Sequence, residues 1–291
     1  LYRLIKEAMV ARYGDPDISN GLAVFHDRVL IYMSTMITPN DRKYRICEIR
    51  EKCEIGKKSD RRKIIITTQL VEAGVDISVD VIFRDMAPLD SIIQAGGRAN
   101  RHGSEVRGEV HILRMINENG KEYSSMVYDP VMLDATRRIF SEVFSNSTDL
   151  IDEKRMHDLV KHYYEELSRS VSSNDSETCL AYFRNLEFSN IGKEFKLIEE
   201  EDKVDLFVAK DCDKEALDVW EHYLEIKAKT DPLERWKRML RIRSRLSGYI
   251  VSVRRKMIGE IDEPLSLVGK GGIALKYDME TGIMDGVDSI W

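Results

Sequence analysis

The sequence predicts an α/β domain with a parallel sheet and flanking helices, followed by a mainly helical region. In residues 1–115, short β-branched runs alternate with helix-like segments, the pattern of a parallel sheet covered by helices. In residues 116–291 helical patterns dominate, and the polar, turn-forming stretch NENGKEYSS after HILRM marks a boundary. We therefore expect two domains, at 1–115 and 116–291, the second with a small β element.

Two strands of the first domain are expected at the centre of its sheet. The run IIITT is continuously apolar before its threonines, and DVIFRD is similar, as in strands that are buried on both faces. The expected strands are 29–34, 63–67, 79–84 and 109–113. The expected helices are 2–13, 39–53 and 91–99.

The second domain combines helical patterns with a few alternating segments. The expected helices are 130–144, 151–167, 214–229 and 232–246. The stretch SRSVSSNDSET predicts a mobile loop between the second and third of them. The segment FKLIEEEDKVDLFVAKD alternates apolar and polar residues around an acidic turn and predicts a hairpin, and LSLVGKGGIALKYDMETGIM predicts further strands.

Composition excludes several classes of protein. With 43% hydrophobic and 33% charged residues and a net charge of −6, the chain is neither disordered nor collagen-like. No apolar run approaches the ~20 residues that span a bilayer, and no signal peptide opens the chain, so we expect a cytoplasmic protein without membrane contact. The four cysteines form no CxxC pair and no zinc-like pattern with histidines, so we expect no metal site. Because the chain opens directly on a helix-like stretch at Leu1, we expect it to be part of a longer protein.

Two segments carry the chemistry, TTQLVEAGVDIS at 67–78 and QAGGRANRHG at 94–103. In the second, Arg98 and Arg101 are three residues apart and would project from one face of a helix, while Gly96 and Gly97 allow close approach of the backbone. Two forked cations in fixed geometry suit a polyphosphate and can stabilise charge on a transferring phosphoryl group. The alternative is a pair of arginines in surface ion pairs.

The first segment ends a buried strand with hydroxyl groups. Thr67 and Thr68 close the apolar run, and the chain continues through Glu72 and Gly74 to Asp76. Ligands of open α/β sheets bind beyond the carboxyl ends of the strands, where these residues are expected. Alone, the two threonines would be strand-end residues that cap the next helix.

These residues support a resemblance to a known family. TTQLVEAGVDIS resembles motif V of superfamily 2 helicases, and QAGGRANR resembles the Q-x-x-G-R-x-x-R form of their motif VI. With VDVIFRDMAPLDSIIQ between them, the pair is similar to the second RecA-like domain of the CRISPR-associated helicase of type I systems, and YMSTMITPNDR resembles the motif IV region of that family. The resemblance covers roughly residues 28–113.

The resemblance implies an ATP-driven translocase that moves 3′ to 5′ on single-stranded DNA, uses ATP and Mg2+, and is recruited by the RNA-guided complex Cascade. It further implies an HD nuclease in the same chain or as a partner. By motif position, Arg98 and Arg101 would be arginine fingers, and Gln94 would contact the nucleotide or its attacking water. The other site residues follow in the same way, with Gly74, Asp76 and Gly97 near the nucleotide and Ser34, Thr35, Thr68 and Gln69 on DNA. Ala95 stands where many of these helicases have an arginine, so no phosphate contact is assigned there.

The sequence lacks the other half of such a motor. It contains no G-x-x-x-x-G-K-[ST] loop: VGKGG at 268–272 lacks the upstream glycine and the following hydroxyl residue. DEPL at 262–265 follows no apolar strand and has a proline where a DEAH box has alanine. In the family, ATP lies between two RecA-like domains, so we expect this chain alone to be inactive and an N-terminal motor half to be its partner.

Other features leave alternatives open. His26-Asp27 and His157-Asp158 spell the dipeptide of HD phosphohydrolases, but six histidines are too few for that fold, and His162 with Glu166 is better explained as a solvated helix face. Residues 235–259 carry nine basic residues and no acidic one, which suits either a track for DNA or a helix whose arginines pair with acidic neighbours such as 199–202. The rival functions are another superfamily 2 motor such as an RNA helicase, and a non-catalytic nucleic-acid or Cascade-docking module. A flavodoxin-like domain would need an early phosphate-binding turn, which the sequence lacks.

Overall fold

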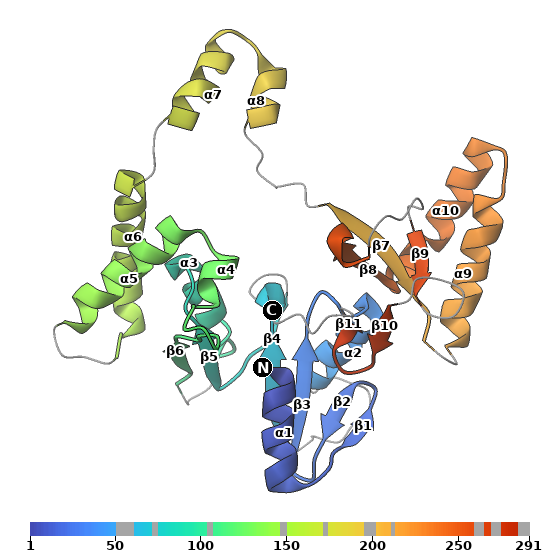
Figure 1. Ribbon diagram of the computed structural model, residues 1–291, viewed down its shortest axis with the longest axis horizontal. Helices are drawn as coiled ribbons and strands as arrows, with labels where there is room; N and C mark the ends of the chain where they lie inside the picture. Colours follow the sequence, from blue (N-terminus) through green and yellow to red (C-terminus); the bar gives the residue numbers. More distant parts are fainter. Residues whose placement is uncertain are drawn as a thin grey trace. The chain divides into compact units, whose positions relative to one another are not determined.

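The computed structural model describes residues 1–50, 61–71, 75–103, 107–145, 150–170, 174–194, 202–210, 213–258, 265–268 and 275–284 (Figure 1). The chain forms two compact units. The first comprises Leu1–Ile77 and Glu201–Ile290, and the second comprises Ser78–Glu200 together with Trp291. The domain division at residue 115 stays a prediction.

The first unit contains a four-stranded sheet in the order β1-β2-β3-β4. Its strands are β1 (Asp17–Ser19), β2 (Leu22–Val24), β3 (Arg28–Met33) and β4 (Arg62–Thr67). The first three are antiparallel neighbours, whereas β3 and β4 are parallel, with Met33 opposite Thr67. The parallel pair therefore ends at one edge of the sheet.

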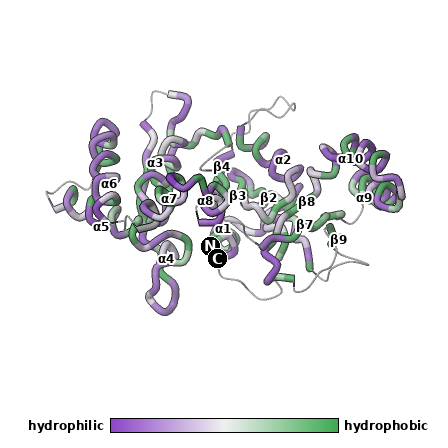
Figure 2. Tube along the Cα trace, turned by 90° about the horizontal axis from the view of Figure 1, so that it is seen from above, coloured by the Kyte–Doolittle hydropathy of each residue, from purple (hydrophilic) through white to green (hydrophobic). Residues whose placement is uncertain are grey.

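Helices cover both faces of this sheet. Helix α1 (Tyr2–Tyr13) packs Met9 into one cluster with Leu30 of β3, and α2 (Pro39–Arg50) packs Ile49 into another with Ile31. Because successive residues of a strand point to opposite faces, β3 is buried on both sides. Figure 2 shows the hydrophobic colouring of β3 and β4. The central, covered strand is thus β3, whereas β4, which carries the IIITT run, lies at the edge of this sheet among the described residues, so the expectation that IIITT forms a central strand was wrong.

A second sheet of the first unit has the order β8-β7-β9. Its strands are β7 (Lys203–Val208), β8 (Ile250–Arg254) and β9 (Leu265–Val268), with β8 antiparallel and β9 parallel to β7. Helices α9 (Lys214–Lys227) and α10 (Pro232–Ser247) pack on one face around Phe207. On the other face, Leu206 and Val208 contact the cluster that contains Ile283. Ile283 belongs to a hairpin of β10 (Lys276–Asp278) and β11 (Gly282–Met284).

The second unit contains the parallel pair β5 (Val81–Asp85) and β6 (Glu109–Leu113). Its helices are α3 (Leu89–Gly96), α4 (Ser124–Val127), α5 (Pro130–Phe144), α6 (Met156–Ser170), α7 (Asn174–Arg184) and α8 (Phe188–Glu194). Its core joins α3, α5 and α6 through Leu89, Ile139 and Tyr163, all of which are buried.

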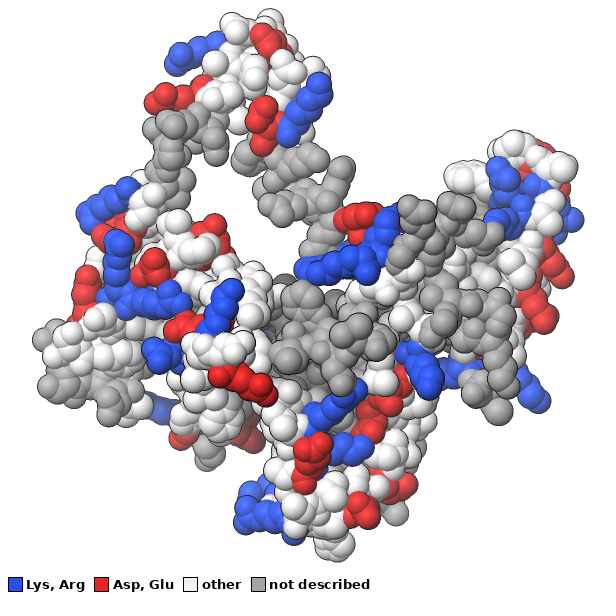
Figure 3. All heavy atoms as spheres, viewed as in Figure 1, with Lys and Arg blue, Asp and Glu red and all other residues white. Residues whose placement is uncertain are grey.

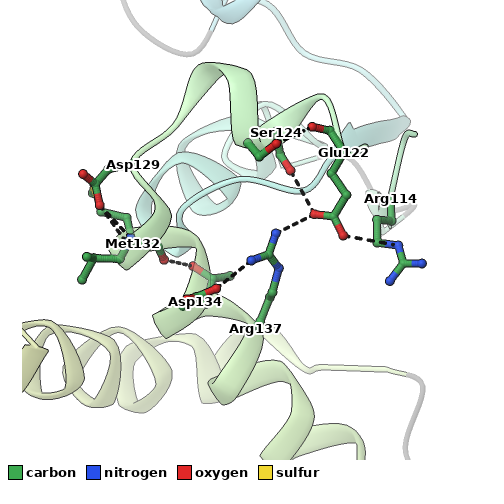
Figure 4. Close-up of polar contacts among 10 residues, drawn as sticks. Arg114, Glu122, Ser124, Asp129, Met132, Asp134 and Arg137 are labelled. Carbon is green, nitrogen blue, oxygen red and sulfur yellow. Dashed lines mark hydrogen bonds and ion pairs between the residues drawn. The ribbon is translucent and has the colours of Figure 1, made fainter. Parts of the chain in front are cut away.

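Polar contacts fix the start of α5 (Figure 4). Asp129 accepts hydrogen bonds from the Val131 and Met132 amides at 2.7 and 3.4 Å, so it satisfies two of the free N–H groups of the first turn. Glu122 lies 2.6 Å from Arg137 of this helix and 3.5 Å from Arg114, which follows β6. These ion pairs connect α5 to the segment that leaves the sheet.

Most expected elements are confirmed, among them helices 2–13 and 130–144 and strand 109–113, whose bounds are met at both ends. The α/β fold class is confirmed as well. Helix 39–53 ends at Arg50 in the part of the chain that the structure describes. Beyond the sequence-based expectations, the structure adds β1, β2, β8 and α8.

Further expectations about strands and loops were wrong. DVIFRD is not buried on both faces, because β5 has β6 as its single strand partner among the described residues and Phe83 is 69% exposed. The predicted hairpin within 195–211 does not form around β7, because β8 and β9 occupy both of its edges; residues 195–201 lie outside the described residues. The segment 168–178 is not a loop throughout, since α7 begins at Asn174.

Candidate functional site

The residues expected to contact DNA lie at one edge of the first sheet. Ser34 and Thr35 follow β3, and Thr68 and Gln69 follow β4. The two strands are parallel, and the Thr68 amide donates a hydrogen bond to the Met33 carbonyl at 3.2 Å. The structure therefore brings these four residues together, as the sequence predicts for carboxyl ends of adjacent strands.

The four side chains differ in what they present to solvent. Thr35, Thr68 and Gln69 are exposed. Ser34 is 4% exposed, and its hydroxyl accepts the Met36 amide at 3.2 Å, so it shapes the turn after β3. Hydroxyl and amide groups at a strand edge can donate hydrogen bonds to phosphate oxygens. Thr35, Thr68 and Gln69 are thus the members of this set that are accessible to a nucleic-acid backbone.

Asp76 is held by an arginine of α2. The Arg50 Nε donates to the Asp76 carbonyl at 2.5 Å, and the guanidinium lies 3.8 Å from its carboxylate. The next residue, Ile77, is 4% exposed and packs in the cluster of Ile31 and Met33. The Asp76 carboxylate therefore lies at the surface on a fixed backbone. Gly74 lies outside the described residues.

Gln94, Gly97, Arg98 and Arg101 lie in the second unit, around the end of α3. The expectation that Arg98 and Arg101 share a helix face was wrong, because α3 ends at Gly96. The Arg98 amide donates to the Ala95 carbonyl at 2.9 Å, which closes a turn at the two glycines, and Ala99 forms a parallel bridge with Val79. Gln94 and Arg101 are exposed, and Arg98 is half-buried.

Residues 96–101, which we call the arginine turn, have a backbone that is fixed from two sides. The Val79 amide donates to the Arg98 carbonyl at 3.0 Å, and the Asn100 amide donates to the Val79 carbonyl at 2.9 Å. On the other side, a Cβ at Gly108 would lie 2.8 Å from Ala99, so only glycine allows this close approach. The sequence analysis missed Gly108, and its signal is a glycine directly before strand β6.

The basic stretch 235–259 divides between two roles. Arg238 pairs with Glu234 at 2.6 Å, Arg245 pairs with Asp218 at 2.9 Å, and Arg255 pairs with Asp202 at 2.9 Å. Four exposed cations of α10 have no carboxylate partner within the described ranges: Arg235, Lys237, Arg241 and Arg243. Figure 3 shows Lys and Arg side chains on the outer surface of the α9–α10 pair. The ion-paired arginines of α10 thus pair with Glu234, Glu215 and Asp218, whereas the pair with Asp202 is made by Arg255, which follows β8; the DNA track stays a prediction.

The described part of the chain contains no cluster of side chains that could bind a metal ion. Among those residues no group of three or more His, Cys, Asp or Glu side chains could hold an ion. His162 lies 3.7 Å from Glu142, whereas Glu166 pairs with Arg169 at 2.7 Å; the Glu166 side chain is largely buried, so the two residues have separate ion-pair partners but do not form a fully solvated face. The segments 262–264 and 269–272 lie outside the described residues. Searching the described helices for a membrane-spanning candidate yields none of sufficient length and apolar character.

Comparison with known proteins shows a similarity to one family. The family model for the C-terminal part of "CRISPR-associated nuclease/helicase Cas3" matches residues 16–104, a segment that contains every candidate site residue. This segment is similar to the C-terminal part of Cas3 proteins. The Cas3 protein of Haloferax volcanii is 39% identical over 99 residues, which cover 33% of this chain and 10% of that protein. The Cas3 protein of Methanothermobacter thermautotrophicus is 28% identical over 158 residues, which cover 54% and 17%.

Solved structures share the fold of nearly the whole chain. A crystal structure of T. fusca Cas3 has a TM-score of 0.59 at 16% identity and covers 97% of this chain and 37% of that one. A chain of the structure named "CRISPR RNA-guided surveillance complex, pre-nicking" has a TM-score of 0.57 at 14% identity and covers 98% and 38%. The chain thus spans a little over a third of these Cas3-type structures.

Proposed function

We propose that this chain is the C-terminal half of an ATP-dependent single-stranded DNA helicase or translocase that acts in CRISPR interference. The observation that carries the proposal is that one match to the Cas3 C-terminal family, residues 16–104, contains both the strand-edge residues and the arginine turn. Relatives named nuclease/helicase and a structure named "T. fusca Cas3-ATP" support the same activity and the use of ATP.

The two groups of site residues have distinct roles in this proposal. Thr35, Thr68 and Gln69 bind the DNA backbone, since they present hydroxyl and amide groups at one sheet edge. Arg98 and Arg101 act as arginine fingers on the γ-phosphate, because a guanidinium keeps its charge and its planar donors match phosphate oxygens. Gln94 orients the attacking water, and Gly97 and Asp76 lie near the nucleotide.

ATP and Mg2+ are held mainly by a partner motor half, because the sequence contains no phosphate-binding loop. When bound, Mg2+ neutralises charge on the β- and γ-phosphates. The residues of this chain fit a second layer of contacts to the nucleotide. Arg101 is an exposed arginine on a fixed turn, and Asp76 has a carboxylate at the surface, so each can approach a bound nucleotide. The chain by itself is therefore inactive in ATP hydrolysis.

The partners follow from the same proposal. An RNA-guided surveillance complex of the Cascade type recruits the motor, which is supported by the fold shared with a chain of such a complex. An HD nuclease acts either in the same longer protein or as a separate chain. Two functions compete with this proposal, an RNA-stimulated motor and a non-catalytic docking module.

The test is ATPase activity of the chain alone and of its mixture with the N-terminal motor half, with single-stranded DNA or RNA of the same length. We expect activity in the mixture alone, with stimulation by DNA. Stronger stimulation by RNA would favour the RNA helicase. A mixture that associates but never hydrolyses ATP would refute the motor and favour the docking module.

A further inference from the structure

The hairpin β10–β11 packs on the loop that follows β3, although it lies more than 230 residues further along the chain. The Thr38 amide donates a hydrogen bond to the Tyr277 hydroxyl at 3.1 Å, and the Ile283 amide donates to the Met36 carbonyl at 2.9 Å. Both strands of the hairpin therefore hold the segment 34–38. This segment contains Thr35, which is exposed.

The Tyr277 hydroxyl also links this loop to the first turn of α2. It donates to Asp41 Oδ2 at 2.6 Å, and Asp41 forms an ion pair with Lys210, which follows β7. Thr38 closes the same arrangement, because its hydroxyl accepts the Asp41 amide at 3.2 Å. The phenol thus joins the loop to α2, and Asp41 extends the contact to Lys210 after β7.

The charge states suit these roles. Burial raises the pKa of Tyr277, and the neighbouring Asp41 carboxylate raises it further, so the phenol keeps its proton at neutral pH. Burial also raises the pKa of Asp41, but hydrogen bonds from Lys210 and Tyr277 outweigh that effect and hold the pKa below its ordinary value. Tyr277 is therefore a neutral donor to a charged acceptor, the stronger kind of hydrogen bond.

The backbone leaves no space between hairpin and loop. Gly282 has a φ of +88°, and a Cβ there would lie 2.2 Å from the Met36 carbonyl oxygen. Such a position accepts only glycine without movement of one backbone. The close approach is thus built into the turn of the hairpin.

We propose that the β10–β11 hairpin is a positioning element for DNA binding, which acts through Tyr277 to hold residues 34–38 so that Thr35 meets the DNA backbone. The inference rests on the proposed function, because Thr35 is a DNA contact only there. It goes further, because it makes residues 276–284 a determinant of how tightly Thr35, Thr68 and Gln69 bind DNA. Tyr277 is a positioning residue and touches no DNA.

The test compares two Tyr→Phe variants of the 291-residue chain. Each variant removes one hydroxyl that forms a hydrogen bond in the packing of the β10–β11 hairpin. Tyr277→Phe removes the bond to Thr38 and Asp41. Tyr2→Phe is the matched control, because the Tyr2 hydroxyl donates to Glu280 Oε1, also at 2.6 Å, at the other side of the hairpin. Binding of fluorescein-labelled oligothymidine is measured by anisotropy, with Thr35→Ala as the reference for a direct contact.

We expect Tyr277→Phe to weaken DNA binding by about tenfold, the value of one hydrogen bond of this kind, and Tyr2→Phe to leave it within about twofold. A second readout needs no DNA: amide hydrogen exchange at Thr38 should become faster in Tyr277→Phe and stay unchanged in Tyr2→Phe. Because Phe keeps the ring and its packing, both readouts isolate the effect of the hydroxyl.

Equal loss of affinity in both Tyr variants would overturn the inference, because both would then act through stability alone. Unchanged exchange at Thr38 would overturn it too. If Thr35→Ala weakens binding and Tyr277→Phe does not, the inference fails while the DNA contact stands. If Tyr277→Phe speeds exchange at Thr38 but neither Thr35→Ala nor Tyr277→Phe changes affinity, the proposed DNA contact of Thr35 fails and only the hydrogen bond that holds the loop stands, so the inference about DNA binding is overturned.

Discussion

Arg45 offers the sharpest test of how the first unit is held together. Its side chain is fully buried, and its guanidinium donates to three backbone carbonyls, of Tyr32 at 2.5 Å, Met279 at 2.5 Å and Glu280 at 2.8 Å. The arginine thus connects β3 and α2 to the turn of the β10–β11 hairpin. We expect Arg45→Met, which keeps the length of the side chain but removes its donors, to destabilise the protein strongly.

The magnitude follows from what the substitution leaves behind. Three buried carbonyls would lose a charged donor, and each unsatisfied polar group costs about 1–3 kcal/mol. The cost is partly offset because burial lowers the pKa of Arg45, which shows that the folded state disfavours the charge, and because its Nε has no hydrogen-bond partner among the described residues. We expect a net loss of about 3–5 kcal/mol in the free energy of unfolding.

Urea denaturation followed by tryptophan fluorescence measures this loss. The control is Lys43→Met, on the same helix two residues away and exposed, which should change the free energy of unfolding by less than about 0.5 kcal/mol. Equal effects of the two substitutions would refute the argument that Arg45 is the central hydrogen-bond donor between α2 and the hairpin.

Two further predictions address the same region. Gly282→Ala should lower the free energy of unfolding by about 1–3 kcal/mol more than Gly14→Ala, because both glycines have a positive φ but only Gly282 faces a backbone atom within 4 Å; equal shifts in thermal unfolding would contradict this. The Asp41 contribution to stability should be present above about pH 4 and lost as the pH falls through the lower pKa of the folded state, since the unfolded carboxyl takes up its proton first. Asp41→Asn should therefore flatten the dependence of the free energy of unfolding on pH below about 4, and an unchanged slope would contradict the lowered pKa.

The strand edge of the candidate site was predictable because its signals are local. The apolar run before Thr67 predicts a buried strand, and parallel neighbours must end at one edge, which places Thr35 beside Thr68. Helix α5 was equally predictable from the sequence, because Asp129 supplies a capping side chain and Pro130 is favoured in the first turn of a helix. Such features depend on a few neighbouring residues.

The geometry of the arginine turn was not predictable from spacing alone. A helical reading of Arg98 and Arg101 assumed that the helix continues, but the backbone turns at Gly96 and Gly97 and then pairs with Val79. The adjacent glycines were the available signal, since glycine ends helices more readily than it continues them.

The contacts of the hairpin were beyond any local pattern. Arg45 lies in the sequence PNDRKYRICEIR, where it resembles its exposed neighbours, and its partners Met279 and Glu280 are more than 230 residues away. Nothing in the periodicity of α2 distinguishes the buried arginine from Lys43. Only the tertiary structure shows which cation is enclosed.

The measurement that tests the central claim most directly is single-turnover hydrolysis of ATP by the chain mixed with its N-terminal motor half and saturated with single-stranded DNA. Arg101→Ala should slow hydrolysis by about 10³–10⁵, as for other arginine fingers, and added guanidinium should restore part of the rate. Arg107→Ala is the matched control, since Arg107 is exposed and lies outside the segment 16–104, and it should hydrolyse ATP like the wild type. Equal rates for Arg101→Ala and Arg107→Ala would contradict the claim that this half of the motor supplies the finger.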